Sequence, residues 1–277
     1  MKQIYIFLFL LLQGFVYGQY DGGYSGGRQA SMGGSAVMLH DGWSSLNNPA
    51  GLAAGENITA GIFYEMRFGM PEFSTRGATF QYPVNSGSFG LAFSWYGFDI
   101  YNEKRFVLAY GRELFPGFYA GLSLDYLHTH LNDQTGLLTG NKGNITFQAG
   151  LQARLSQQVW LGFSVFNPWT VGLSEYDADN VPAVMRLGLS YEAGDDFLIV
   201  LESEQNLRHK LRFKSGLEYQ INEKFLARGG INTNPTAYSF GAGLEFQGIV
   251  FDITAVYHLV LGYSPHGSFL YEFHSRR

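Results

Sequence analysis

The sequence contains no cysteine, few charged residues and only one long apolar run. The absence of cysteine excludes a disulfide framework, thiolate catalysis and a cysteine-linked lipid anchor. Only 15% of residues are charged and the formal net charge is −5, so a nucleic acid partner is not expected. The apolar run at residues 4–12 falls well short of the roughly 20 residues that a membrane-spanning helix needs. If the chain crosses a membrane, it must therefore do so with strands.

The apolar run near the N-terminus has the features of a secretory signal. Lys2 supplies a positive charge before it, and the small residue Gly18 follows at a distance suited to cleavage. We predict that residues 1–18 are a signal peptide that is removed on export. A retained anchor is the alternative, and the short length of the run argues against it.

Three regions follow from composition: the signal at residues 1–18, a glycine-rich segment at residues 19–56, and a strand-bearing body at residues 57–277. The body alternates apolar with small or polar residues. Phe89, Leu91 and Phe93 fall on one side of a strand, opposite Gly90 and Ala92. Such strands are typical of a wall between lipid and a polar interior.

The body contains about 14 strand candidates, and the uncertain one near Phe73 leaves 12 or 16 possible. They begin near Asn57, Phe73, Gly87, Tyr101, Gly117, Gly143, Gln158, Pro182, Asp196, Lys210, Lys224, Thr236, Ile249 and His266. Every second connection is short, whereas the opposite set includes longer loops at residues 129–142 and 167–181. These features predict an all-β fold, a closed antiparallel barrel in the outer membrane of a Gram-negative bacterium. A secreted β-sandwich is the main competitor, but so many strands would be unusual for one.

A weak rhythm of Gly-Leu pairs runs through the body. The pairs begin at Gly121, Gly150, Gly188, Gly216 and Gly243. Several are separated by 27 to 29 residues, about the length of one hairpin. This rhythm predicts a meander of antiparallel neighbours.

The glycine-rich segment carries a set of residues that suggests a relationship. The set is Arg28, Met32, Gly33, Gly34, Asp41, Asn48, Pro49, Ala50, Gly51 and Leu52. In this order, between a signal and a strand pattern, it resembles the FadL-like outer-membrane barrels, and among them the PorV/PorQ group of Bacteroidetes. The resemblance implies that residues 19–56 form a short hatch in the lumen of a 14-stranded barrel.

Charged residues of both signs occupy positions expected to face the interior. The candidates are Glu65, Arg67, Asp125, Arg154, Arg186, Glu202, Arg212, Glu218, Arg228 and Asp252. A mixed set favours an ion-pair network that stiffens the wall and holds the hatch. A selectivity lining is the alternative, but selective pores tend to use rings of one sign.

The sequence offers little for catalysis or metal binding. His128 and His130 would share one face of a strand, but no cysteine and no suitably spaced carboxylate joins them. No Gly-x-Ser-x-Gly segment stands on a strand-to-helix turn. We expect no cofactor, no metal and no enzymatic activity.

Two functions remain from these observations. The resemblance to PorV/PorQ implies an accessory subunit of a secretion or surface-assembly complex, such as type IX secretion, with other outer-membrane or periplasmic proteins as partners. The alternative is FadL-like passive transport of a hydrophobic small-molecule ligand. The short outer loops argue against ligand capture from outside, and a plugged lumen argues against a general diffusion porin. In each case outer-membrane lipid surrounds the wall.

Overall fold

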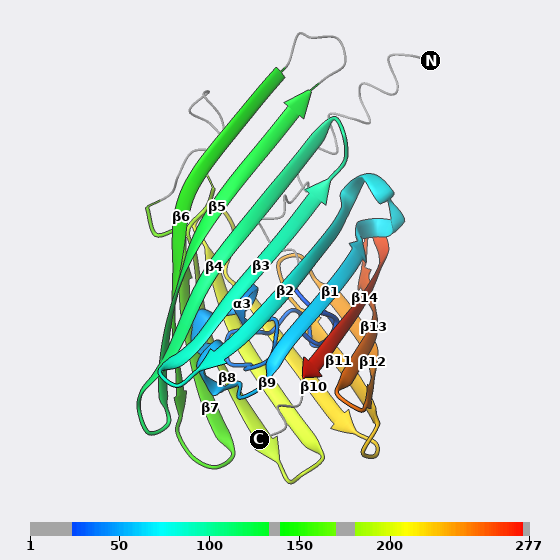
Figure 1. The fold of residues 1–277 in the computed structure, drawn as a ribbon. Coiled ribbons are helices and arrows are strands. Elements are labelled where there is room, and N and C mark those ends of the chain that lie inside the picture. The colour runs from blue at the N-terminus through cyan, green and yellow to red at the C-terminus, as the bar shows by residue number, and fades with distance from the viewer. Residues whose placement is uncertain (1–23, 133–138, 170–180, 274–277) are drawn as a thin grey trace.

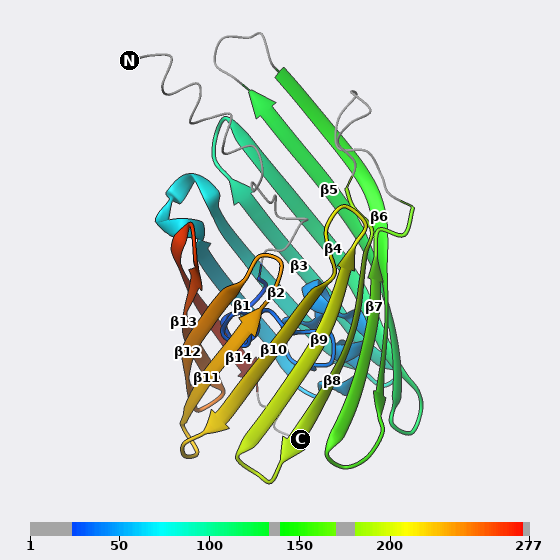
Figure 2. The same ribbon diagram turned by 180° about the vertical axis from the view of Figure 1, so that it is seen from behind.

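The computed structural model describes residues 24–132, 139–169 and 181–273, which form a barrel around a short N-terminal segment (Figures 1 and 2). The described residues contain fourteen strands. These are β1 (Ile58–Met66), β2 (Ser74–Val84), β3 (Gly87–Gly97), β4 (Tyr101–Phe115), β5 (Phe118–Asn132), β6 (Thr139–Arg154), β7 (Val159–Phe166), β8 (Val184–Ala193), β9 (Phe197–Asn206), β10 (Arg212–Gln220), β11 (Phe225–Asn232), β12 (Ala237–Phe246), β13 (Ile249–His258) and β14 (Gly262–Phe273).

Every strand pairs with its neighbours in the chain, and β1 closes the sheet by pairing antiparallel with β14. Ile58 lies opposite Phe273, and Glu65 lies opposite His266. Closure leaves no free sheet edge along β1 and β14. The ends of the barrel are named as they lie in Figure 1: the turn from β2 to β3 is at the lower end, and the connection from β1 to β2 is at the upper end.

The two faces of the wall differ as the alternation predicts. Leu91 has 53% of its surface exposed on the outside, whereas the next residue, Ala92, has 8% exposed and faces the lumen. Large apolar side chains are exposed all around the outside, while buried carboxylates, amides and hydroxyls fill the inside. Such a distribution is the reverse of that in a water-soluble domain and suits a wall surrounded by hydrocarbon.

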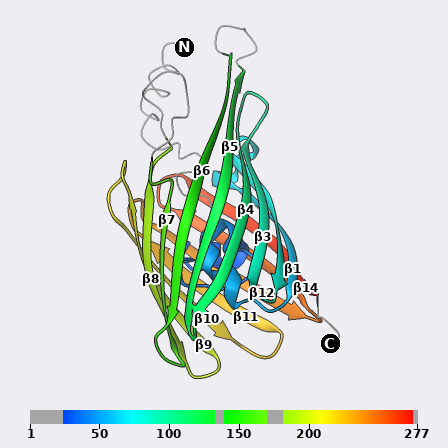
Figure 3. The ribbon, with the colours of Figure 1, turned by 60° about the vertical axis from the view of Figure 1, so that its left-hand side comes forward.

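The predicted barrel is confirmed, and with it the uncertain strand near Phe73, which is β2. The β-sandwich is therefore excluded. One connection was predicted wrongly, because residues 129–142 are mostly strand: Thr129 of β5 pairs with Lys142 of β6. Polar residues had suggested a loop there, but β4, β5 and β6 continue upward beyond the rest of the wall (Figure 3).

Residues 24–56, here called the inner segment, lie inside the barrel (Figure 1). The segment contains helices α2 (Gly27–Ser31) and α3 (Ser44–Asn47) and the 3-10 helix η2 (Pro49–Ala54). Two further 3-10 helices, η3 (Arg67–Gly69) and η4 (Pro71–Phe73), connect β1 to β2. None of the helices in the described residues is both long and apolar enough to cross a membrane. The predicted signal peptide lies outside the described residues, so its cleavage stays a prediction.

Candidate functional site

Glycines on the inner face of the wall let the inner segment approach the backbone of the strands. We call this set the glycine seat: Gly90, Gly111, Gly121, Gly150, Gly162, Gly188, Gly216, Gly230 and Gly241. A methyl group on Gly111 would stand 2.5 Å from the carbonyl oxygen of Pro49, and one on Gly150 would overlap the side chain of Asn48. Larger residues at these positions would displace the inner segment.

The glycine seat explains most of the Gly-Leu rhythm in the sequence. Gly121, Gly150, Gly188 and Gly216 contact the inner segment, and the leucine after each points outward. Gly243 differs, because it makes room for the guanidinium of Arg228 instead. The spacing of the Gly-Leu pairs therefore reflects contact with the inner segment as well as the meander. It is the sequence signal from which the glycine seat could have been predicted.

The ten residues that carry the family resemblance are here called the hatch motif, and among them Asn48 makes the most side-chain hydrogen bonds. Its side chain is fully buried, and its Oδ1 accepts the backbone N–H of Ala50 at 3.1 Å, which caps η2. Its Nδ2 donates to the carbonyl of Val37 at 2.6 Å, so one side chain joins two parts of the inner segment. Longer contacts at 3.3 and 3.4 Å reach the carbonyls of Leu151 and Phe163 in the wall. Pro49 and Ala50 then fit against Gly121.

The wall binds the backbone of the inner segment through polar side chains on many strands. The contacting residues are Thr79 and Gln81 of β2, Gln148 and Gln152 of β6, Glu202 of β9, Lys214 of β10, Ser239 of β12, Thr254 of β13 and Ser268 of β14. Glu202 accepts two of these bonds, from the backbone N–H of Ala36 at 2.7 Å and from that of Val37 at 2.9 Å. Buried backbone groups that lack an internal partner are thus satisfied by the wall.

Other members of the motif have clear positions. Met32 is fully buried and packs with Val37 and Met38. Gly33 has a φ of 69° and donates its N–H to Ser239, while Gly34 has a φ of 80° and accepts from Lys214. Left-handed backbone at both positions favours glycine. Gly51 lies close to Ser44, and Leu52 packs in an apolar cluster with Trp43 and Leu46.

The first of two charged clusters attaches helix α2 to the wall. Arg28 binds both carboxylate oxygens of Glu218, at 2.7 and 2.8 Å, and lies 3.6 Å from Asp41. Glu218 also accepts from Arg228, which reaches Asp252 in turn. Predicted residues of the motif and of the lumen network therefore meet in one cluster. A bidentate guanidinium–carboxylate pair of this kind is among the stronger polar contacts.

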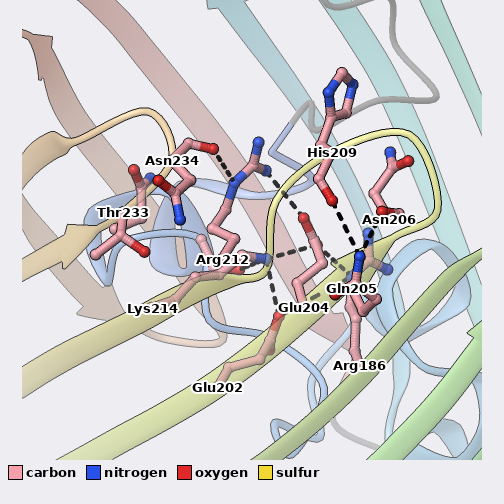
Figure 4. A network of polar contacts seen from close by, with 12 residues as sticks. Arg186, Glu202, Glu204, Gln205, Asn206, His209, Arg212, Lys214, Thr233 and Asn234 are labelled. Atoms are coloured by element: carbon pink, nitrogen blue, oxygen red, sulfur yellow. Dashed lines mark hydrogen bonds and ion pairs between the residues drawn. The ribbon is translucent and has the colours of Figure 1, made fainter.

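The second charged cluster lies on β8, β9 and β10 (Figure 4). Lys214 lies between Glu202 and Glu204, at 2.8 Å from each. Arg186 and Arg212 also bind Glu204, at 2.7 and 2.9 Å. Because Glu202 also holds the backbone of the inner segment, the cluster fixes the wall and the segment together.

The remaining predicted charged residues lie outside these two clusters. Asp125 binds Arg105 at 2.6 Å, and Arg105 was not among the predicted residues. Glu65 and Arg67 form a separate pair at 3.7 Å. Arg154 does not join a cluster: it is exposed at the lower end of β6, 5.9 Å from the ring of Trp160. Its position as the last residue of that strand puts it beyond the packed part of the lumen.

His40 is a buried titratable residue of the inner segment. Its ring packs against that of Trp160 at a tilt of 33°, with 4.5 Å between centroids. Burial, with a smaller contribution from Arg28, lowers the pKa of His40 to about 4. His40 is therefore neutral at physiological pH.

Two small cavities border the inner segment at its start. One, of about 70 Å³, lies among Glu65, Arg67 and Arg212, and the other, of about 30 Å³, lies beside Arg186 and Lys214. Each suits one or a few water molecules. Among the described residues no group of His, Asp and Glu is arranged to hold a metal ion.

No family model and no curated protein sequence matches the chain. Solved structures with the same fold do. The Ralstonia pickettii toluene transporter TbuX is 14% identical, with a TM-score of 0.74 over 92% of this chain and 100% of that one. A Pseudomonas aeruginosa FadL homologue is 11% identical, with a TM-score of 0.68 over 91% and 99%. The Pseudomonas putida toluene transporter TodX is 13% identical, with a TM-score of 0.67 over 89% and 96%. At such identities the likeness shows the fold alone, which this chain shares with these three proteins.

Proposed function

We propose that this protein is a non-enzymatic outer-membrane barrel that lets small hydrophobic molecules pass, with the inner segment acting as a movable hatch. The observation that carries the proposal is how the inner segment is held. Side-chain hydrogen bonds and ion pairs attach it to the wall, whereas backbone ladders join all fourteen strands of the described chain. The segment can therefore shift while the barrel stays closed, because water can replace polar side-chain contacts.

The fold likeness supports a hydrophobic cargo. TbuX and TodX are toluene transporters, and the likeness covers about nine-tenths of this chain. A small cargo also agrees with the packing, since the glycine seat brings the wall directly against the inner segment. Release of cargo through the lumen thus requires movement of residues 24–56.

A reversible cross-link tests this proposal. A Cβ on Gly241 would stand 2.5 Å from the Cβ of Ser31, so a Ser31→Cys/Gly241→Cys variant can form a disulfide once the inner segment has moved away from Gly241 by about 1 Å, to the usual Cβ spacing of about 3.8 Å. The natural chain has no cysteine, so no other thiol competes. Toluene uptake is measured in intact Gram-negative cells, whose outer leaflet slows free entry.

We expect the reduced variant to take up toluene and the oxidised variant to lose most of that uptake. Wild-type protein under the same oxidising conditions is the matched control. Equal uptake by the oxidised and reduced forms contradicts a moving hatch. Uptake no greater than in cells without the protein contradicts the transport function itself.

A second candidate is an accessory subunit of a secretion or surface-assembly complex, as the sequence resemblance implies. The observation that favours it is the close packing of the inner segment against the wall glycines, together with the upper parts of β4, β5 and β6, which extend above the other strands (Figure 3). Purification from gently solubilised membranes separates the two candidates. Stable co-purification of other envelope proteins supports the accessory function, and recovery of the barrel alone in several mild detergents opposes it.

A further inference from the structure

The turn from β13 to β14 consists of aliphatic residues. Leu259, Val260 and Leu261 follow one another between the two strands, and we call them the β13–β14 tip. Val260 has 84% of its surface exposed and Leu259 has 58%. Turns are usually built from glycine, proline and small polar residues, which suit the exposed backbone there. Three aliphatic side chains in an exposed turn therefore indicate contact with apolar surroundings.

The side chain of His258 holds the tip in shape. Its Nδ1 accepts the backbone N–H of Val260 at 3.2 Å and that of Leu261 at 3.1 Å. The ring of Phe68 in η3 meets the His258 ring nearly edge-on, with 6.0 Å between centroids. Because both N–H groups have a partner within the turn, the backbone costs less to place in an apolar medium.

The β13–β14 hairpin differs from the other turns at the upper end in its lack of charge. No Asp, Glu, Lys or Arg occurs from residue 253 to residue 271, which includes the upper parts of both strands. Asp99 lies in the turn from β3 to β4, and Arg208 and Lys210 lie in the turn from β9 to β10. The exposed Glu72 belongs to η4, which contacts β3, whereas η3 contacts β14. The hairpin itself therefore brings no formal charge to the tip.

The lengths of the connections show which end of the barrel faces outward. Those at the lower end have two to four residues, whereas that from β7 to β8 at the upper end has 17. Short turns face the periplasm in barrels of this kind, and longer loops face outward. The β13–β14 tip therefore lies on the side of the outer leaflet.

Aromatic side chains give the level of the tip in the membrane. Tyr257 and Tyr263 pair across β13 and β14 directly below the tip, with 4.7 Å between their rings. Tyrosines on the outer face mark the boundary between hydrocarbon and headgroups. A strand rises about 3.3 Å per residue and is tilted by about 40°, so the tip stands about 5–8 Å above that boundary. The headgroup layer is about 5–7 Å thick, so the tip ends within it.

The opposite side of the barrel is higher. β6 and β13 are seven strands apart in the ring of fourteen and so stand across the lumen from each other. Tyr126 marks the boundary on β5, and that strand continues six residues further, to Asn132. The same rise places its end about 15 Å above the boundary, where His130 and Asn141 contact each other. The rim is therefore high and polar on one side and low and apolar on the other (Figures 2 and 3).

The cavity of about 70 Å³ described above lies just inside the tip. Val256 and His258 of β13 and Ser264 of β14 line it on the rim side. Tyr24, at the start of the inner segment, lines it as well, and its hydroxyl accepts the side-chain amide of Asn232 at 3.0 Å. The low rim, the cavity and the inner segment thus follow one another toward the lumen.

We propose that the β13–β14 tip lies in the outer leaflet and that hydrophobic cargo enters the barrel from the leaflet over this tip. Lipid covers the tip because the apolar outer faces of β13 and β14 continue into it without a charged residue. The cavity beside Tyr24 widens when the inner segment shifts. The entry route rests on the transport function proposed above, whereas the lipid contact does not. Such a route needs no long outer loop to capture cargo.

Spin labels test the lipid contact. Single cysteines at Val260, at Leu91 on the lipid-facing wall and at Asn141 on the high side are labelled in a chain that has no other thiol. The protein is placed in vesicles of phosphatidylethanolamine and phosphatidylglycerol, with no other protein present. Oxygen, which concentrates in hydrocarbon, should relax the labels at positions 260 and 91 more than a water-soluble nickel complex does. The label at position 141 should show the reverse.

Two results overturn the lipid contact. Stronger relaxation of the label at position 260 by the nickel complex places the tip in water. A label at position 260 that neither reagent reaches is covered by a second copy of the chain. Resistance of the folded barrel to heat in detergent shows that each labelled variant is folded.

Toluene uptake by intact cells tests the entry route. A Leu259→Ser/Val260→Ser variant should lose most of the uptake above that of cells without the protein. The matched control, Leu155→Ser/Ile221→Ser, changes two similarly exposed aliphatic residues at the lower end and should keep wild-type uptake. Wild-type uptake by the tip variant, or an equal loss in the control, overturns the entry route alone. A wild type without uptake refutes the transport function and the route together, and the spin labels still decide the lipid contact.

Discussion

Replacement of Asn48 by alanine should loosen the inner segment and leave the barrel intact. The side chain caps Ala50 at 3.1 Å and binds the carbonyl of Val37 at 2.6 Å. Each net hydrogen bond contributes about 1 kcal/mol, and a buried N–H left without a partner costs about 1–3 kcal/mol. The carbonyl of Val37 keeps a second donor, the amide of Gln152 at 3.0 Å, so it is not orphaned. We expect a loss of about 2–4 kcal/mol from the inner segment.

Hydrogen exchange read out by mass spectrometry measures this loss by region. Because each 1.4 kcal/mol changes an equilibrium tenfold, amides in residues 27–54 should exchange about 30-fold faster or more in Asn48→Ala. Amides of the strands should keep their wild-type rates, because no ladder hydrogen bond is removed. Asn47→Ala is the matched control: its side chain makes a single longer contact, to Ser25 at 3.2 Å, and should change exchange much less.

Two outcomes refute this reasoning. Faster exchange in the strands, to the same degree as in the inner segment, means that the segment and the barrel unfold as one unit. Unchanged exchange in the inner segment means that Asn48 does not hold it, whatever the short distances indicate.

Three further predictions concern the glycine seat, the cluster at Arg28 and the titration of His40. Gly150→Ala should destabilise the inner segment by about 1–3 kcal/mol because its methyl group overlaps Asn48. Gly229→Ala should not, because its methyl group would stand 3.8 Å from the nearest atom, the carbonyl oxygen of Ser239. Thermal melts in detergent compare the two variants. Glu218→Gln removes the carboxylate shared by Arg28 and Arg228 and should cost about 3–5 kcal/mol, seen as faster proteolysis of the inner segment; an unchanged cleavage rate would contradict the assigned role. The pKa of His40 in the folded protein, about 4, is lower than its ordinary value of 6.5, so its contribution to stability is present above pH 6.5 and is lost as pH falls through 4. Acidification should therefore lower the protection factors of amides in the inner segment of the wild type, after correction for the slower intrinsic exchange at low pH, and less so in His40→Phe, which keeps a ring against Trp160.

Much of the barrel could be predicted because adjacent residues of a strand in a membrane wall alternate between the lipid side and the lumen side. Leu91 and Ala92 already show which side meets lipid, and β2 was found despite its weak pattern. The upper parts of β5 and β6 were mistaken for a loop because their residues lie above the apolar belt, where the alternation of apolar and polar residues fades. Pairing across β5 and β6 keeps that region in strand even where the pattern is weak.

The candidate site could be predicted only in part. Arg28, Asn48 and Glu218 were identified as candidates, but no local pattern reveals that Arg28 binds Glu218 across 190 positions of sequence. Arg105 was missed as the partner of Asp125, and Arg154 was included although it lies at the exposed end of β6. Register decides such contacts, because a shift of one residue turns a side chain to the opposite face.

The sequence by itself determined that the chain forms strands with an apolar and a polar side, since alternation is a property of neighbouring residues. Only the tertiary structure decided that nine glycines from nine strands meet the inner segment. These contacts join residues far apart in the chain, and closure of the barrel sets the register that brings them together.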